Sequence, residues 1–248
     1  MGVKKSSMAH TYNYDTYEDM VADPAWRKRL TSLNNALVKT MGGTDEEPSL
    51  NGNLFYAHKD PHFVQSDLID KFEVKRKNFF KLAKHISTLL EVGVNGGHSL
   101  FLALSANPSL QVIGVDVAVR LETSWAPVEK YVPAAFKWLE KEFPDRCTFI
   151  KGNSLVELPK FTLNNQSLVV DAVHLDGSKD THLRELLAVL PLMNEGGFVV
   201  FDDANTKPVL KGIGQVKKLN IARPRDLTHM GIERTPGQRI FPILDASG

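Results

Sequence analysis

The sequence predicts a doubly wound α/β fold built on a mostly parallel sheet. Between residues 88 and 201, short runs rich in β-branched and apolar residues alternate with apolar stripes at helical spacing. Strands that alternate with helices pair in parallel through right-handed crossover connections. A chain of 248 residues suits one large domain better than two. We therefore expect an N-terminal extension or lid at residues 1–65 and one α/β domain at residues 66–248.

The N-terminal part predicts helices joined by a polar loop. A helix is expected at residues 24–41, because Asp23 suits its N-cap and Pro24 its first helical position. The glycine-rich and polar residues 42–52 predict a solvated loop. From Ser66 the apolar residues recur at helical spacing again. Basic residues lie among them, and we interpret these as a solvated face: Lys71, Lys75, Arg76, Lys77 and Lys81.

The next segments predict the sheet. Helical stripes are expected at residues 98–106, 128–139 and 183–190. Five segments have the composition of buried strands: residues 88–94, 111–117, 147–151, 169–175 and 197–201. The tail differs, because residues 227–232 and 239–244 are separated by turn residues and predict an antiparallel hairpin at one edge. The sheet would then have seven strands.

Composition excludes several classes of protein. Thirty basic and 29 acidic residues leave a net charge of +1, so no overall field attracts nucleic acid or an anionic membrane. No stretch approaches the ~18 apolar residues of a membrane span, and residues 1–10 lack the apolar core of a signal peptide. The single cysteine, Cys147, excludes an internal disulfide and a cysteine-based zinc site. We expect a cytoplasmic protein without nucleic-acid or membrane partners, and a homo-oligomer stays open.

Glycine and polar residues follow each of the five expected strands. In an open α/β sheet, ligands bind beyond the carboxyl ends of the strands, near the point where the strand order reverses. The residues at these ends are Glu91, Gly93, Asn95, Gly96 and Gly97, then Asp116, then Asn153 and Ser154, then Asp176 and Gly177, and last Asp202 and Asp203. A structural scaffold does not need such a rim, so we expect a ligand site there.

The first turn, EVGVNGGHS at residues 91–99, indicates the kind of ligand. Its glycines allow positive φ and a close approach to the backbone, and the next helix offers free N–H groups. A dinucleotide fold prefers G-x-G-x-x-G, but Asn95 stands at the second glycine position and Glu91 would repel a pyrophosphate. A carboxylate at Glu91 suits the ammonium group of a methionine moiety. Asp116 suits a ribose in either class of cofactor.

The ordered series of motifs resembles that of class I S-adenosylmethionine-dependent methyltransferases. The series runs E-x-G-x-x-x-G-x-S, V-I-G-V-D, K-G-N-S, H-L-D-G and G-G-F-V-V-F-D-D, within a resemblance that covers about residues 67–244. It is similar above all to the small-molecule O-methyltransferases that include the macrolide-sugar enzymes, and more distantly to catechol O-methyltransferase. The resemblance implies a Rossmann-like fold with S-adenosylmethionine as cofactor.

The resemblance also implies roles for individual residues. Cofactor-binding roles fall on Glu91, Gly93, Asn95, Gly97, Ser99, Asp116, Asn153, Ser154 and Asp176. In metal-dependent relatives, residues matching Asp176, Asp202 and Asp203 bind a divalent cation. Three converging carboxylates repel one another unless they are protonated, solvated or neutralised, and all-oxygen ligation suits Mg²⁺. Alternatively, Asp202 caps the next loop, Asp203 faces water and Asp176 contacts only the cofactor.

The general base is less well defined by the motifs. These relatives usually have a histidine two residues after the fourth-strand Asp-Gly, where this chain has Lys179. His182, on the first turn of the next helix, is one candidate, because imidazole titrates in a useful range. Lys179 is another if its pKa is depressed. Both are also compatible with solvated positions at a helix start. We expect His98 to pack and His174 to be a hydrogen-bonded core histidine.

We therefore expect methyl transfer from S-adenosylmethionine to an oxygen of a small molecule, a sugar or a phenolic natural product, with Mg²⁺ assistance. Three alternatives stay open: an N-methyltransferase, a non-catalytic cofactor-binding or partner subunit, and a nicotinamide-dependent enzyme. N-terminal aromatic residues such as Tyr56 and Phe63 could form a lid over the substrate, but covering apolar surface is their commoner role. The sequence does not name the acceptor.

Overall fold

A computed structural model describes residues 13–42 and 47–244. Its described residues form one six-stranded sheet in the order β3-β2-β1-β4-β5-β6. The strands β1 to β5 run parallel, and β6 runs antiparallel to β5. Their bounds are β1 Thr88–Val92, β2 Gln111–Asp116, β3 Cys147–Lys151, β4 Val170–Leu175, β5 Met193–Asp202 and β6 Gln238–Pro242. The strand order reverses between β1 and β4, so the two carboxyl ends there flank the switch point.

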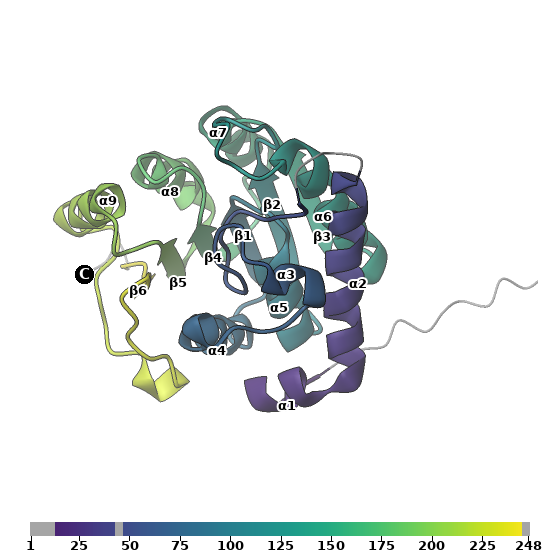
Figure 1. Cartoon of the computed structure of the whole chain (residues 1–248). Helices are drawn as coiled ribbons and strands as arrows, with labels where there is room; N and C mark the ends of the chain where they lie inside the picture. Colours follow the sequence, from purple (N-terminus) through teal and green to yellow (C-terminus); the bar gives the residue numbers. More distant parts are fainter. Residues whose placement is uncertain (1–12, 43–46, 245–248) are drawn as a thin grey trace, which may run out of the picture.

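Helices cover both faces of this sheet (Figure 1). Side chains alternate along each strand, so Leu89 packs in one core and Leu90 in the other. The first core includes α2 Pro24–Met41, α4 Glu73–Ala83, α5 His98–Ala106 and α6 Val128–Glu142. The second includes α7 Ser154–Asn164, α8 His182–Val189 and α9 Lys207–Lys218. The expected doubly wound, mostly parallel α/β fold is confirmed. No helix within the described ranges has both the length and the apolar character of a membrane span.

The N-terminal residues pack into the first core. The helix expected at residues 24–41 is confirmed as α2, and Asp23 Oδ1 caps it by accepting a hydrogen bond from the Ala25 N–H at 2.8 Å. This helix lies beside α6 (Figure 1). Trp26 is fully buried and stacks on Phe101 of α5 at a centroid distance of 5.2 Å. Two shorter helices, α1 Tyr17–Ala22 and α3 His62–Gln65, flank α2 in the sequence.

The tail corrects the prediction of seven strands, because the described residues contain six. Instead of a strand, residues 227–232 contain a 3₁₀ turn, Thr228–Met230, which ends at Gly231 with a φ of 69°. The N–H groups of Met230 and Ile232 both donate to Leu227 O, so they are used locally rather than in a ladder. The final strand β6 therefore pairs with β5. Helices α7 and α9 were not predicted, and residues 43–46 of the expected loop lie outside the described residues.

A buried histidine joins the N-terminal segment to the helix that follows the glycine turn. His98 Nε2 lies 2.8 Å from Asn34 Oδ1 of α2, and its Nδ1 lies 3.3 Å from Asn53 Nδ2. The ring packs against Tyr56 and Phe63 and is 1% exposed, so the expectation that His98 packs is confirmed. Burial lowers its pKa from 6.5 to about 3. The native protein therefore keeps this imidazole neutral.

This neutral histidine predicts a loss of stability in acid. The unfolded chain takes up a proton at His98 below about pH 6.5, whereas the folded chain does so only near pH 3. The free energy of unfolding should therefore fall as pH drops through this window, by at most about 1.4 kcal/mol per pH unit from this residue. Urea unfolding of the wild type and of His98→Gln between pH 7 and pH 4 measures this slope. Equal slopes in the two proteins would contradict the assignment.

Candidate active site

One large cavity opens at the carboxyl ends of the parallel strands. It has a volume of about 1180 Å³ and lies at the ends of β1, β2, β4 and β5. Residues 51–53, 57 and 58 of the N-terminal segment and the beginning of α4 also line it. The volume exceeds the roughly 300–1,000 Å³ of a pocket for one drug-sized ligand. The cavity therefore has room for a cofactor and a second molecule.

The glycine turn after β1 brings the backbone close to β4. Gly93 lines the cavity with a φ of 90°, and a Cβ there would lie 2.6 Å from Asp176 O. Gly97 has a φ of 75°, but its Cβ would meet Leu139 Cδ1 of α6 at 3.0 Å, and it does not line the cavity. Gly93 thus shapes the ligand site, whereas Gly97 lets α5 pack on α6.

Two of the expected cofactor residues serve a buried network instead of the cavity wall. Glu91 is fully buried in β1. Its Oε1 accepts a hydrogen bond from Ser99 Oγ at 2.7 Å, and its Oε2 lies 2.7 Å from His174 Nδ1 of β4. Neither Glu91 nor Ser99 lines the cavity. This geometry does not bring the Glu91 carboxylate to a ligand ammonium group.

Asn95 connects the N-terminal segment to the turn after β1 by hydrogen bonds. Its Nδ2 donates hydrogen bonds to Asn51 O at 3.1 Å and Gly52 O at 2.9 Å. Its Oδ1 accepts one from the Tyr131 hydroxyl of α6 at 2.8 Å. The residue adopts a φ of 51°, a left-handed conformation that asparagine tolerates better than most residues. Asn95, Asn51 and Gly52 all line the cavity, so the side chain that replaces a glycine here builds its wall.

Asp116, Asn153 and Ser154 line the same side of the cavity, as their places at strand ends predict. Asp116 Oδ2 accepts a hydrogen bond from the Asn95 N–H at 3.1 Å, and Oδ1 accepts one from the Ala118 N–H at 2.7 Å. Each oxygen keeps a second lone pair for a hydroxyl. Burial raises the pKa of Asp116. Asn153 caps α7 through the Leu155 N–H, and Ser154 Oγ donates to Glu185 Oε1 at 2.6 Å.

Three aspartates and two lysines meet on the opposite side of the cavity. Asp176 follows β4, and Asp202 ends β5 and is followed by Asp203. Lys75 of α4 forms an ion pair with Asp202 Oδ1. Lys179 Nζ lies 3.1 Å from Asp176 Oδ1 and 2.9 Å from Asp203 Oδ2. The expected convergence of the aspartates is thus present, and each of them contacts a lysine.

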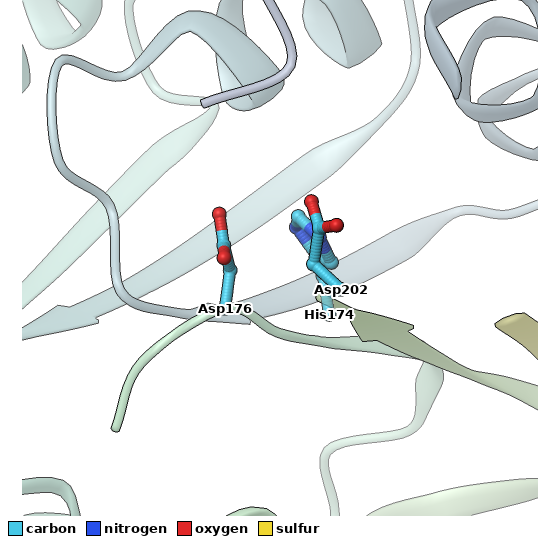
Figure 2. Close-up of side chains that lie close together, drawn as sticks. All are labelled: His174, Asp176 and Asp202. Carbon is cyan, nitrogen blue, oxygen red and sulfur yellow. The ribbon is translucent and has the colours of Figure 1, made fainter. Parts of the chain in front are cut away.

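His174 lies directly beneath this cluster. Figure 2 shows the carboxyl groups of Asp176 and Asp202 pointing to the same side, with the imidazole beside Asp202. His174 Nε2 faces Asp202 Oδ2 at 3.9 Å, and the residue is fully buried. Burial lowers its pKa, but Asp202 and Glu91 outweigh burial and raise it to about 10. The expected hydrogen-bonded core histidine is confirmed, and it carries a positive charge.

Comparison with known families adds to this geometry. Residues 90–204 match a family model described as a methyltransferase domain. The match confirms the resemblance to class I methyltransferases and, with it, the expected class of enzyme. Among curated proteins, none matches the chain in sequence.

Several solved structures of methyltransferases have a fold similar to that of this chain. CalS11, a calicheamicin methyltransferase, is 13% identical with a TM-score of 0.54, over 98% of this chain and 99% of its own. TomG from Streptomyces achromogenes, an O-methyltransferase solved with SAM, is 16% identical with a TM-score of 0.54, over 88% and 90%. An O-methyltransferase from Bacillus cereus, solved with SAH, is 17% identical with a TM-score of 0.51, over 72% and 83%. At such identities the likeness shows the fold.

Neither expected general base has a suitable environment in the structure. Burial opposes the charge on Lys179, but Asp176 and Asp203 outweigh it and raise its pKa, so the amine stays protonated. His182 is 1% exposed, does not line the cavity, and has its pKa lowered to about 4 by burial and by Lys179. Asp176 is better suited, because burial raises its pKa to about 7 against the opposing charge of Lys179. Asp176 lines the cavity.

The aspartate cluster fits a divalent cation poorly in the arrangement that the structure has. His174, Asp176 and Asp202 lie close enough to hold an ion, since their ligand atoms are all within 4.8 Å of one another. However, Lys75 and Lys179 occupy carboxylate oxygens that a cation would need. Magnesium therefore has no role in the chemistry considered below.

Two cavity residues were missed by sequence reasoning, and some aromatic residues have other roles. Lys75 was interpreted as part of a solvated face, which is wrong, because its side chain is 12% exposed and pairs with Asp202. Glu185 of α8 is buried and accepts from Ser154, and no motif indicated it. Trp26, Tyr56 and Phe63 are fully buried in the core. His58 and Trp125 line the cavity, whereas His62 pairs with Asp60.

Proposed function

We propose that the protein transfers a methyl group from S-adenosylmethionine to a hydroxyl of a small molecule, a sugar or a phenol. One observation carries the proposal. At the switch point, one cavity has a half around Asp116 that suits a nucleoside and a charged half around Asp176. The activity of one similar structure agrees in kind, because CalS11 is described as a TDP-rhamnose 3′-O-methyltransferase. A cytoplasmic location and a homo-oligomer stay predictions from the sequence.

The first half of the cavity suits the cofactor. Gly93 leaves the backbone open at the turn, and Asp116 offers two carboxylate oxygens to a ribose diol. Asn153 and Ser154 line the adjacent wall, where a base would lie. Residues 51–53, 57 and 58 of the N-terminal segment also line the cavity. When bound, S-adenosylmethionine supplies a methyl group that is already electrophilic, so positioning the acceptor is the main task of the protein.

The second half suits the acceptor. The acceptor hydroxyl must lose a proton as its oxygen attacks, and a base is most effective when its pKa lies near the working pH. Asp176 meets this condition, with a pKa of about 7 and a place on the cavity wall. Its Oδ1 is bonded to Lys179, so we assign the proton to Oδ2. Phe72 and Asn205 also line this half and would contact the acceptor.

Isothermal titration with S-adenosylmethionine and with S-adenosylhomocysteine tests cofactor binding. We expect both to bind at sub-millimolar concentration, and no binding would exclude the proposal. A panel of sugar nucleotides, phenols and amines with methyl-labelled cofactor then tests transfer. Labelled ether products support the proposal, and labelled amines only would make the protein an N-methyltransferase. Binding without transfer to any acceptor would support a non-catalytic subunit.

Asp116→Asn provides the sharpest test of the cofactor half. The amide keeps the shape of the carboxylate but loses the charge and one acceptor position for the ribose diol. Hydrogen bonds to charged groups are worth roughly 1.5–3 kcal/mol, so affinity for S-adenosylhomocysteine should fall about 10- to 100-fold. Asp145→Asn is a matched control, because Asp145 is exposed and precedes β3 at the other end of the sheet. Unchanged affinity in Asp116→Asn would remove the ribose assignment.

A further inference from the structure

Contacts with several parts of the chain fix the position of the Lys75 side chain beside the aspartates. It projects from the first turn of α4, lines the cavity, and pairs with the buried Asp202. A Cβ on Gly237 would lie 2.8 Å from Lys75 Cε and 3.1 Å from its Nζ, so a larger residue at this position would displace the end of the lysine side chain. The ammonium also lies 5.6 Å from the centre of the Phe72 ring. Three separate segments therefore place this one charge.

Lys179 neutralises the other two aspartates. Its ammonium lies between Asp176 Oδ1 and Asp203 Oδ2, at 3.1 and 2.9 Å. It comes from the loop between β4 and α8, whereas Lys75 comes from the N-terminal side of the domain. Two elements far apart in the sequence thus converge on one acidic group. Their positive charges remove the mutual repulsion of the carboxylates, which is the task that a divalent cation would otherwise perform.

The pairing of charges in the cluster points the same way. Each of the three aspartates contacts a lysine ammonium: Asp202 contacts Lys75, and Asp176 and Asp203 contact Lys179. A divalent cation added to this arrangement would lie beside these two ammonium groups and close to a cofactor that is itself positive at sulfur, and like charges repel. The cluster in its present form therefore favours the cationic cofactor over an added cation.

We propose that Lys75 and Lys179 take the place of a divalent cation, so that lysine ammonium groups hold the acceptor oxygen and methyl transfer requires no metal. The inference rests on the proposed function for the identity of the acceptor. An ammonium has three donors, and Lys75 uses one of them on Asp202. The others can donate to an acceptor oxygen in the cavity and stabilise its developing negative charge. Lys75 and Lys179 are then positioning residues for the acceptor.

Binding of Mn²⁺, followed by electron paramagnetic resonance with and without S-adenosylhomocysteine, tests the substitution directly. We expect no binding to the wild type below about 1 mM, the range of weak protein sites for divalent cations. Lys75→Met/Lys179→Met leaves the aspartates without their cations, and its affinity for Mn²⁺ should rise at least about tenfold. Lys71→Met is the matched control, because Lys71 lines the same cavity on the same segment and forms none of these ion pairs. Its affinity should not change.

Two outcomes would overturn the inference. One is sub-millimolar binding of Mn²⁺ by the wild type that disappears in Asp202→Asn. The other is a double variant that folds, by its thermal melt, and gains no affinity. Gly237→Ala gives a second route if the double variant does not fold, since it displaces Lys75 while leaving every charge in place. It should gain Mn²⁺ affinity in the same direction as the double variant.

Activity adds an independent readout. With any acceptor found in the panel, the rate of methyl transfer by the wild type should be the same with excess EDTA as with added Mg²⁺. A loss of more than about tenfold in EDTA, restored by Mg²⁺, would overturn the inference. Failure of S-adenosylmethionine to bind would instead exclude the proposed function. The Mn²⁺ measurement still decides between lysine and metal in that case, so the two failures are distinguishable.

Discussion

Asp176→Asn is expected to lower kcat for methyl transfer by about 10²- to 10⁴-fold, the usual contribution of a general base. Asparagine has nearly the same shape but cannot take a proton at the position of Oδ2. The loss should appear mainly in kcat, because the hydroxyl proton moves only as the methyl group is transferred. Steady-state transfer of a labelled methyl group, with binding of S-adenosylhomocysteine as a check on folding, measures the effect.

The same residue predicts the acid limb of the pH profile. A base must be ionised to act, so kcat of the wild type should rise with pH and level off above about pH 7, where Asp176 titrates. The charge of Lys179 lowers the pKa of Asp176. Lys179→Met should therefore move the midpoint of the limb to higher pH, whatever it does to the maximal rate. A fully active Asp176→Asn, or an unmoved midpoint in Lys179→Met, would assign the proton to another group.

The cofactor half of the site could be predicted because it depends on local sequence. A residue that directly follows a strand of a parallel sheet must lie at the carboxyl edge, whichever strands are neighbours. Gly93, Asp116 and Asn153 lie at or just after strand ends and line the cavity. Element boundaries could also be predicted from the local sequence, since Asp23 and Pro24 mark the start of α2. The prediction of a strand in the tail was wrong for a local reason too, because Gly231 ends a tight turn where apolar residues indicated a strand.

The charges of the acceptor half could not be predicted, because they depend on strand order and helix docking. Lys75 lies 127 positions before Asp202, and lysines spaced along an amphipathic helix usually face solvent. Only the packing of α4 against the domain shows that this lysine points inward. Glu91 was assigned to the cofactor from its place in the motif. Its real partner, His174, becomes visible only when β1 and β4 are paired, with Glu91 and His174 in register.

The pairing of Glu91 with His174 predicts the largest effect on stability. Both side chains are fully buried, and His174 Nδ1 lies 2.7 Å from Glu91 Oε2. Removing one member of a buried ion pair leaves the other charge uncompensated, which costs about 3–5 kcal/mol. His174→Leu should therefore lower the free energy of unfolding by about this amount near neutral pH. Equilibrium urea unfolding, followed by circular dichroism, measures the loss.

The double variant Glu91→Leu/His174→Leu distinguishes the effect of the ion pair on stability from the effect of the volume that the two side chains fill. Two apolar side chains of moderate size leave no buried charge, so the double variant should be more stable than the sum of the single losses predicts, by about 0.5–3 kcal/mol. Additive losses would show that packing, rather than charge, couples the two strands. The double variant should also lose activity although it folds, because His174 supports Asp202 at 3.9 Å and Asp202 holds Lys75. Stability regained without activity would show that β1 and β4 tolerate an apolar contact where the acceptor site needs a charged one.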